Sequence, residues 1–542
     1  MGGQHHESEA AFLRKRLTRR DVIRGGVGIA AAASVAPFVG ACGDDGTTSP
    51  SESPTGSVAP KAGGNLRVGE SGGSSKESLD AHKLSATASM EAFQLNLYDP
   101  LLEYSPEGKI ENALAEEVQV NSTATQFTVR LKPDLTFHNG KPVTADDVVY
   151  TFARILDPKD PGLGAEQLIG LPRDGVKKVD TLTARFELTQ PNAVFTEALA
   201  AYCNGIVPVD YAPQGASGAI GAGPFMDDKF LPGQQAVFVR NPNYWREVYP
   251  EELTILEFAD PAARMNALLG EQIDYLTDIP TPQVDVVQNT SGLKTLEAKT
   301  GFWIPFTMRV DVKPFSDVRV RQAFRLIVDR EEMLTNAYSG YGWIGNDMYA
   351  PFDPAYPKDL PQREQNLDEA KSLLKAAGYE GLDVELMTWD SVSSTAPAAA
   401  QVFAEQAKGA GVTVKVRKLD SNIFWGDQYL KWPFAMDYWT TRNYLPQTAM
   451  GTQPNAQYNE THWDSVEWLA LVREAFRTAD ETRRNEPVAE ASTIEYNEGG
   501  YIIWAFNTLV DGFSDKVTGA VPDVSGLAGA ACKARFRLVH FV

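Results

Sequence analysis

Cysteine and histidine are scarce in this chain, which limits the chemistry it can perform. Its 542 residues include three cysteines and six histidines. Apart from the adjacent His5 and His6, no two histidines have helical or zinc-like spacing, so we expect no metal site. With Cys42 assigned to lipid as argued below, Cys203 and Cys532 remain. The sequence leaves open whether these two form a disulfide or stay as buried free thiols.

The chain also lacks a hydrophobic run long enough to cross a membrane. The best candidate, residues 27–39, is Ala-rich and about 13 residues long, against the roughly 20 that a spanning helix needs. Arg19 and Arg20 precede this run, and VGAC at residues 39–42 ends it. These features are typical of an export signal at residues 1–41, and the arginine pair favours the twin-arginine route. The cysteine after the cleavage site predicts lipidation at Cys42; the alternative is an ordinary secretory signal with a chance cysteine.

Acidic residues exceed basic ones by a wide margin. The 71 aspartates and glutamates outnumber the 50 lysines and arginines, which gives a formal charge of -21. An acidic surface disfavours nucleic acid and anionic lipid as partners. Residues 42–62 are rich in Gly, Ser, Thr and Pro and predict a flexible tether. We therefore expect an exported body that a lipid anchors to the outer face of the cytoplasmic membrane, on the periplasmic or cell-surface side.

The hydrophobic periodicity of the body predicts a mixed α/β fold. Alternation indicates a strand at 127–131, and Thr144 with Asp147 indicates a capped helix start. Asp317 and Asn366 are N-cap signals for two further helices. Residues 253–276 and 382–417 each have the order strand, helix, strand, which in the second segment implies parallel pairing. A chain of this length needs roughly two to four domains.

No motif gives good support for catalysis. The mature chain has no P-loop and no dinucleotide-binding fingerprint, and we expect no cofactor. Residues 69–73 (GESGG) match G-x-S-x-G, but a polar loop follows Ser71 where the motif requires an apolar helix. His82 and His540 are poorly placed as its base. We interpret the segment as a loop whose amides and Ser71 can contact a ligand, and we expect no enzyme; a secreted serine hydrolase is the less favoured alternative.

Tryptophan is concentrated in one part of the chain and indicates a ligand pocket there. Eight of the ten tryptophans lie between residues 300 and 470. Some must be core, but Trp and Tyr also hold ligands with little loss of side-chain entropy. Residues 438–444 (YWTTRNY) combine aromatics with one cation, which suits a pocket wall; the alternative for Arg442 is a surface or interdomain ion pair. The candidate ligand-binding residues are Ser71, Trp389, Asp390, Trp425, Tyr438, Trp439 and Arg442.

Six stretches of the body carry a family resemblance. They are LYDPLLEYSPEGKIENALAEE (97–117), FHNGKPVTADDVVYTFARILDP (137–158), GAGPF (221–225), RNPNYW (240–245), PFSDVRVRQAFRLIVDREEM (314–333) and NLDEAKSLLKAAGY (366–379). On these residues the chain resembles the extracytoplasmic solute-binding proteins of the peptide/nickel class, family 5, which are the receptors of ABC importers.

The resemblance implies a periplasmic-binding-protein-like α/β fold of type II, cluster C, with three domains in two lobes. Domain I would comprise residues 63–96, 207–300 and 498–542, and domain II, inserted in the same lobe, residues 97–206. Domain III, residues 301–497, would form the other lobe. A small solute or peptide would bind between the lobes as they close about a hinge. The loaded monomer would then deliver it to the permease and ATPase subunits.

The expected pocket differs from that of dipeptide-binding members of the family. Leu445 aligns with the aspartate that holds the ligand's amine in those members, and residues 389–400 contain no arginine for its carboxylate. Arg442 instead suggests an anionic group on the ligand. The ligand class stays open between an unusual peptide, an opine-like compound, an oligosaccharide and a metal chelate. A membrane-anchored sensor that signals without transport is the alternative function.

Overall fold

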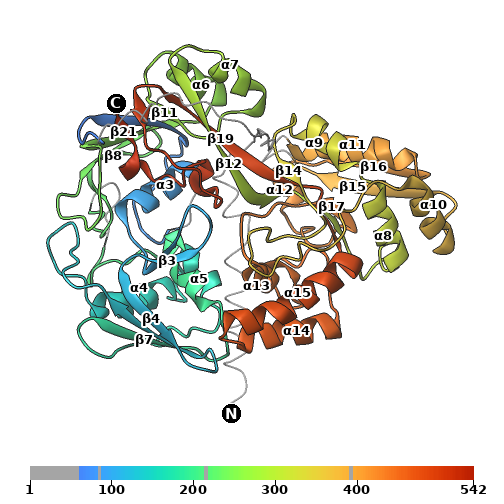
Figure 1. Ribbon diagram of the computed structural model, residues 1–542, viewed down its shortest axis with the longest axis horizontal. Helices are drawn as coiled ribbons and strands as arrows, with labels where there is room; N and C mark the ends of the chain where they lie inside the picture. The colour runs from blue at the N-terminus through green and yellow to red at the C-terminus, as the bar shows by residue number, and fades with distance from the viewer. Residues whose placement is uncertain (1–59, 84–86, 213–217, 390–394) are drawn as a thin grey trace, which may run out of the picture.

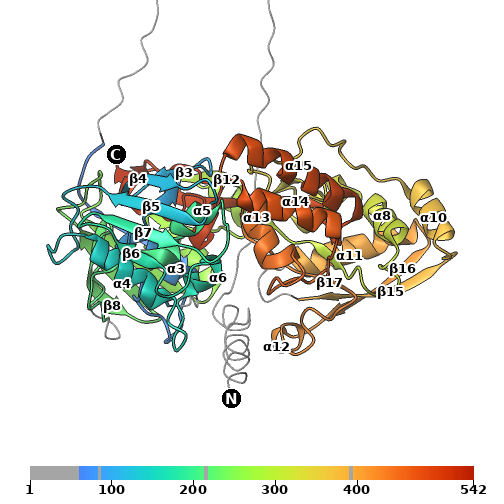
Figure 2. The ribbon, with the colours of Figure 1, turned by 90° about the horizontal axis from the view of Figure 1, so that it is seen from below.

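The chain forms two lobes that lie side by side (Figures 1 and 2). The computed structural model describes residues 60–83, 87–212, 218–389 and 395–542. We call lobe A the part with the eight-stranded and four-stranded sheets, and lobe B the part with the five-stranded sheet. The predicted mixed α/β, two-lobed fold is confirmed, whereas Cys42, Asp390 and most of the predicted tether lie outside the described residues. No helix within these ranges is long and apolar enough to span a membrane.

The large sheet of lobe A is built around a buried central strand. Its order is β12-β19-β11-β1-β10-β9-β8, and β14 also pairs with β19. The strand, helix and strand predicted at 253–276 are β10, α6 and β11, and β1 lies between the two strands, parallel to both. The bounds are β1 (Asn65–Ser71), β8 (Phe225–Leu231), β9 (Gln235–Arg240), β10 (Glu252–Phe258), α6 (Pro261–Leu269), β11 (Tyr275–Leu276), β12 (Leu293–Trp303), β14 (Trp343–Ile344) and β19 (Ala505–Ser514).

The second sheet of lobe A is antiparallel, in the order β4-β5-β7-β6. Phe127, Val129 and Leu131 are at most 1% exposed, which confirms the predicted alternation of β5. Phe152 of α4 packs edge-on against Phe186 of β7, with ring centroids 4.9 Å apart. The bounds are β4 (Ala115–Val120), β5 (Gln126–Leu131), β6 (Val176–Lys178) and β7 (Thr183–Glu187). Two further two-stranded sheets pair β2 (Leu102–Tyr104) with β3 (Ile110–Asn112) and β20 (Val517–Thr518) with β21 (His540–Phe541). The helices are α3 (Ala88–Leu97), α4 (Ala145–Ile155), α5 (Phe195–Leu199) and α7 (Val284–Gln288).

Lobe B packs helices on a small sheet of order β16-β15-β17-β13-β18. β15 and β16 are parallel, as predicted from residues 382–417. The strands are β13 (Phe306–Met308), β15 (Leu382–Thr388), β16 (Val412–Lys418), β17 (Phe434–Met436) and β18 (Tyr501–Ile502). The helices are α8 (Val318–Ile327), α9 (Arg330–Ala337), α10 (Leu367–Ala376), α11 (Thr395–Lys408), α12 (Ser421–Phe424), α13 (Tyr444–Gln447), α14 (Val466–Arg477) and α15 (Glu481–Glu498).

The predicted helix caps are confirmed. The main-chain N–H of Thr144 donates to the Asp147 carboxylate at 2.8 Å before α4. Asp317 accepts from the N–H of Arg319 at 2.9 Å, and Asn366 accepts from that of Glu369 at 3.1 Å. Each bond satisfies a donor that the first turn of a helix leaves without a partner.

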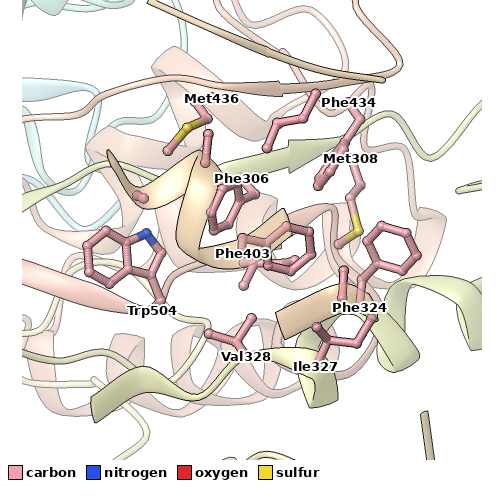
Figure 3. Packing of buried hydrophobic residues seen from close by; sticks show 14 of the residues in the cluster. Phe306, Met308, Phe324, Ile327, Val328, Phe403, Phe434, Met436 and Trp504 are labelled. Carbon is pink, nitrogen blue, oxygen red and sulfur yellow. The ribbon is translucent and has the colours of Figure 1, made fainter. Parts of the chain in front are cut away.

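Phenylalanines form the centre of the lobe B core (Figure 3). Phe403 of α11 lies 4.7 Å from Phe306 of β13, measured between ring centroids, and 6.0 Å from Phe324 of α8. Phe434 of β17 lies 5.6 Å from Phe324. The apolar faces of two helices therefore meet the sheet at one aromatic cluster, which fixes how they pack on it.

Two strand crossings join the lobes. β12 pairs with β19 in lobe A, and β13 pairs with β18 in lobe B, both antiparallel. The chain passes from β12 to β13, and from β18 to β19, through two residues each time. In Figure 1, β12 and β19 run together from lobe A toward lobe B. β14 adds a third connection, because it comes from the segment between α9 and α10 and pairs with the start of β19. A change in the angle between the lobes is therefore expected to involve residues 303–306 and 502–505 together with the segments beside β14.

Asp347 anchors the second crossing. Its carboxylate accepts from the N–H of Ile503 at 3.0 Å, and its own N–H donates to the Ile503 carbonyl at 3.0 Å. The carboxylate also forms ion pairs with Arg330, at 2.7 Å, and with Arg363. Burial acts to raise the pKa of Asp347, but the two guanidinium groups outweigh it and hold the pKa below its ordinary value.

Both cysteines in the described residues are buried free thiols. Cys203 lies in the short helix η2 (Tyr202–Asn204), and Cys532 lies near Asp511 in the core of lobe A. Burial raises the pKa of Cys203 to about 12. Of the two alternatives left open above, the disulfide is wrong and the free thiols are confirmed.

Replacing Asp347 with asparagine is expected to lower the free energy of unfolding by about 3–5 kcal/mol, because the buried Arg330 and the partly buried Arg363 lose their counter-charge. Urea unfolding followed by tryptophan fluorescence measures the loss. Asp368→Asn is the matched control, since its side chain is 98% exposed, and its cost should stay below about 1 kcal/mol. Equal losses in the two variants would contradict the anchoring role.

Candidate functional site

A cavity of about 260 Å³ lies between the lobes. Lobe A contributes wall residues from β2, α5 and η2, and lobe B contributes them from residues 438–450. A second cavity, of about 50 Å³, lies inside lobe A beside Asp99 and Arg535 and has room for a few waters. Since residues of both lobes line the larger cavity, it is the candidate site.

Three of the predicted ligand-binding residues line this cavity: Tyr438, Trp439 and Arg442. Trp389 and Trp425 are not in its wall; they are 0% and 4% exposed and pack behind Tyr438, with ring centroids 5.8 and 5.9 Å from it. The indole N–H of Trp389 donates to the carbonyl of Met436 at 3.1 Å, which secures the end of β17. In this structure these two side chains support the wall from behind.

Ser71 does not have the setting of a nucleophilic serine. It ends β1, and the residues described after it form a loop until α3 begins at Ala88. His82 donates from Nε2 to the carbonyl of Gly205 at 2.9 Å. Burial and the adjacent Arg154 lower the pKa of His82 to about 4. Ser71 also lies outside the wall of the inter-lobe cavity, so it stays a predicted ligand contact only.

Trp439 connects the cavity wall to the first crossing. Its main chain exchanges two hydrogen bonds, of 3.0 and 2.9 Å, with Trp303 at the end of β12. Its ring stacks on Trp303 at 6.2 Å; Trp303 stacks on Tyr349 at 5.6 Å, and Tyr349 on Tyr444 at 5.3 Å. The indole N–H donates to Glu460 at 2.7 Å. A wall residue is thus the first member of an aromatic stack that passes through the crossing.

Most of the concentrated tryptophans are core residues. Six of the eight between residues 300 and 470 are at most 4% exposed, namely Trp303, Trp389, Trp425, Trp439, Trp463 and Trp468. Of the eight, Trp439 alone lines the cavity. The concentration of tryptophans between residues 300 and 470 is therefore mainly a feature of the lobe B core, where large rings fill the space between the helices and a small sheet.

The part of the wall that lobe A contributes was not predicted. Glu197 of α5 accepts from the Tyr104 hydroxyl at 2.9 Å and from the Asn443 amide at 3.2 Å, so it connects the lobes. Burial raises the pKa of Glu197 to about 7; the bond from Asn443 opposes this shift and the charge of Asp353 adds to it. Glu197 and Asn443 are 246 residues apart. No local sequence pattern could have paired them.

Arg442 is the cation of the lobe B wall. Its guanidinium carbon lies 5.6 Å from the centroid of the Trp439 ring, within the range of a cation–π contact. Its charge also reaches the other lobe, where it opposes the effect of burial on the pKa of Tyr104. Lobe A contributes three carboxylates to the wall, Glu91, Glu166 and Glu197. Nowhere in the described ranges do three His, Cys, Asp or Glu side chains cluster so that they could hold a metal ion.

Trp439→Ala is expected to lower the free energy of unfolding by about 3–5 kcal/mol, because it opens a hole in a packed aromatic stack. Trp439→Phe keeps a ring in the stack but removes the N–H bond to Glu460, and should cost about 1–3 kcal/mol. Chemical denaturation of both variants separates the two contributions. If the alanine variant were as stable as the wild type, the stack would not support this wall.

Comparisons with known proteins agree with this geometry. The family described as bacterial extracellular solute-binding proteins, family 5 Middle, matches residues 109–460. The dipeptide-binding protein of Pseudomonas aeruginosa is 26% identical over 473 residues, which cover 79% of this chain and 87% of that protein. The dipeptide-binding protein of Escherichia coli is 24% identical over 495 residues, which cover 83% of this chain and 91% of that protein.

Solved structures share the fold. The binding protein AgaA of A. tumefaciens R10, in complex with agropinic acid, has a TM-score of 0.72 and 22% identity, and the match covers 88% of this chain and 99% of that chain. The ABC transporter substrate binding protein CtaP of Listeria monocytogenes has a TM-score of 0.77 and 21% identity, with 89% and 100% covered.

Proposed function

Because the chain belongs to the bacterial extracellular solute-binding proteins of family 5, we propose that it is the substrate-binding component of an ABC importer. It captures a peptide-like or other small solute and delivers it to the permease and ATPase subunits. The observation that carries this proposal is the cavity between the lobes, whose wall is shared by β2 and α5 of lobe A and residues 438–450 of lobe B. A site divided in this way forms fully only when the lobes come together.

The paired crossings support a closing motion. Residues 303–306 and 502–505 carry the chain directly from one sheet to the other, and β14 also joins the large sheet between α9 and α10 of lobe B. Small rotations there move the whole of lobe B against lobe A, which is how two-lobed proteins enclose a solute. Three domains, with the bounds given above for domains I, II and III, are part of this proposal.

The size of the cavity favours a small solute. Its volume of about 260 Å³ lies near the lower end of the roughly 300–1,000 Å³ typical of sites for drug-sized ligands. Two relatives are named dipeptide-binding proteins, and AgaA was solved with agropinic acid. A dipeptide or opine-sized compound therefore fits the proposal better than a long oligosaccharide. The proposed function involves no covalent chemistry.

The purified protein is expected to carry a co-purified solute, because closed lobes release it slowly. Native mass spectrometry should show one bound species per chain that disappears on unfolding. Arg442→Ala should weaken its retention by about 10- to 100-fold, the effect of losing one charged hydrogen bond. Arg417→Ala is the control, since Arg417 is a lobe B cation with a side chain 60% exposed. Equal retention in both variants would place the site elsewhere.

We further propose that Cys42 is lipidated after twin-arginine export and that the monomer stays tethered to the membrane. Cys42→Ser is expected to abolish incorporation of labelled fatty acid and to release the protein into the soluble fraction. Lysines in place of Arg19 and Arg20 should instead block export through the twin-arginine route and leave the precursor inside the cell. Fatty-acid labelling of the serine variant would contradict the anchor.

A further inference from the structure

Two glutamates of lobe A meet at the loop that follows β1. Glu77, in this loop, and Glu257, in β10, both accept a hydrogen bond from the main-chain N–H of Gly73, at 3.2 and 3.1 Å. Two carboxyl groups that share one N–H donor lie close enough to repel each other strongly if both are charged. We propose that Glu257 keeps a proton at neutral pH and donates it to Glu77, and that this proton holds the loop closed against lobe A.

The hydrogen bonds indicate which member of the carboxyl pair carries the proton. Glu77 accepts from the N–H groups of Gly73, Ser74 and Gly233, at 3.2, 3.2 and 2.9 Å, and from the Thr87 hydroxyl at 2.8 Å. So many donors favour the carboxylate form, which only accepts. Within the described residues, the carboxyl group of Glu257 accepts from Gly73 alone, and its buried Oε1 has no hydrogen-bond partner. The proton therefore belongs on Glu257, whose O–H gives Glu77 a further donor.

A third carboxyl group lies beside Glu257. Glu70 of β1 is its Cα partner in the parallel register, so the two side chains project from the same face of the sheet. Glu70 is 0% exposed, and among the described residues its Oε1 has no hydrogen-bond partner. Burial, Glu77 and Glu70 raise the pKa of Glu257 to about 9, and the Gly73 bond opposes this shift.

The charges around Glu70 do not supply a cation to the pair. Burial raises the pKa of Glu70 to about 8; Thr277 and Arg264 oppose this shift, and Asp511 and Asp278 add to it. The guanidinium of Arg264 is itself within 3.7 Å of the Asp278 carboxylate. Lys76, the cation of the loop, is exposed to solvent. A second negative charge on the pair would therefore be poorly compensated, whereas a proton removes it.

Glu77 connects the loop to two other parts of lobe A. Gly233 belongs to the turn between β8 and β9, and Thr87 is the N-cap of α3. The Thr87 hydroxyl accepts from the N–H of Met90 at 3.4 Å while it donates to Glu77. When Glu257 loses its proton, repulsion within the pair should move the loop away from β10 and loosen the start of α3. This inference concerns lobe A alone and does not depend on the proposed function.

The direction of the pH dependence follows from the raised pKa of Glu257. In the open loop this glutamate regains an ordinary pKa, so the closed loop binds one more proton at pH values between the two. The equilibrium constant for opening should then rise by about ten-fold for each pH unit between roughly pH 5 and pH 9, and level off above that range. The loop is therefore held closed most firmly at acidic and neutral pH.

Hydrogen exchange followed by mass spectrometry on the whole mature protein tests this inference. The readout is the opening constant of peptides that cover residues 72–77 and 231–235, corrected for the intrinsic exchange rate at each pH. In the wild type it should rise by about 100-fold between pH 6 and pH 8. Infrared spectra at neutral pD should also show a protonated carboxyl C=O band that Glu257→Gln removes.

The two members of the pair should respond differently to the same substitution. Glu257→Gln keeps an N–H donor toward Glu77, so its loop should stay closed with an opening constant that changes less than three-fold between pH 6 and pH 8. Glu77→Gln removes the shared acceptor and should open the loop at least ten-fold at both pH values. Glu111→Gln is the matched control, because it removes a glutamate at an exposed position of lobe A and should behave like the wild type.

Each other result overturns the inference. An opening constant in the wild type that does not change with pH would show that no proton holds the loop, and a full pH dependence in Glu257→Gln would place the proton on another group. If calcium chloride closes the loop saturably at pH 8, the pair binds a metal ion in place of the proton. Should Glu77→Gln fail to fold, the wild type and Glu257→Gln still decide. Solute binding plays no part in these measurements, so their failure leaves the importer proposal unaffected.

Discussion

The pairing of β12 with β19 is the constraint on which the rest of the structure depends. These strands complete the large sheet of lobe A, and two residues beyond them the chain enters the sheet of lobe B as β13 and β18. Two short antiparallel connections resist shear but allow bending. The position of lobe B, and with it the shape of the cavity, is set at these crossings.

Each crossing is held by side chains from lobe B. At the first, the main chain and ring of Trp439 bind Trp303, so a wall of the cavity is built directly on the end of β12. At the second, Asp347 holds Ile503 and is itself balanced by Arg330 and Arg363. The buried carboxylate of Asp347 is stabilised there because it pairs with both guanidinium groups. Rigid anchors on both sides of a short connection confine the motion to the connection itself.

The candidate site is divided between the two lobes. Lobe A supplies carboxylates and lobe B supplies Arg442 and aromatic rings. Neither wall is a complete site. The bond between Glu197 and Asn443 joins the walls at one edge, so the electrostatics of the site and the closure of the lobes share the same residues.

The sequence alone determined the features that depend on neighbours along the chain. Caps at Thr144 and Asn366 and the alternation of β5 were predictable because residues two to four positions apart decide them. The six stretches that carry the family resemblance also predicted the two-lobed fold. The tertiary structure decided the rest. Trp389 and Trp439 both follow strands of lobe B and both are at most 1% exposed, yet of the two only Trp439 lines the cavity, because packing and not composition sets what a buried ring faces. Glu197 joined the site because the fold brings together positions 246 residues apart, a contact that no local pattern records.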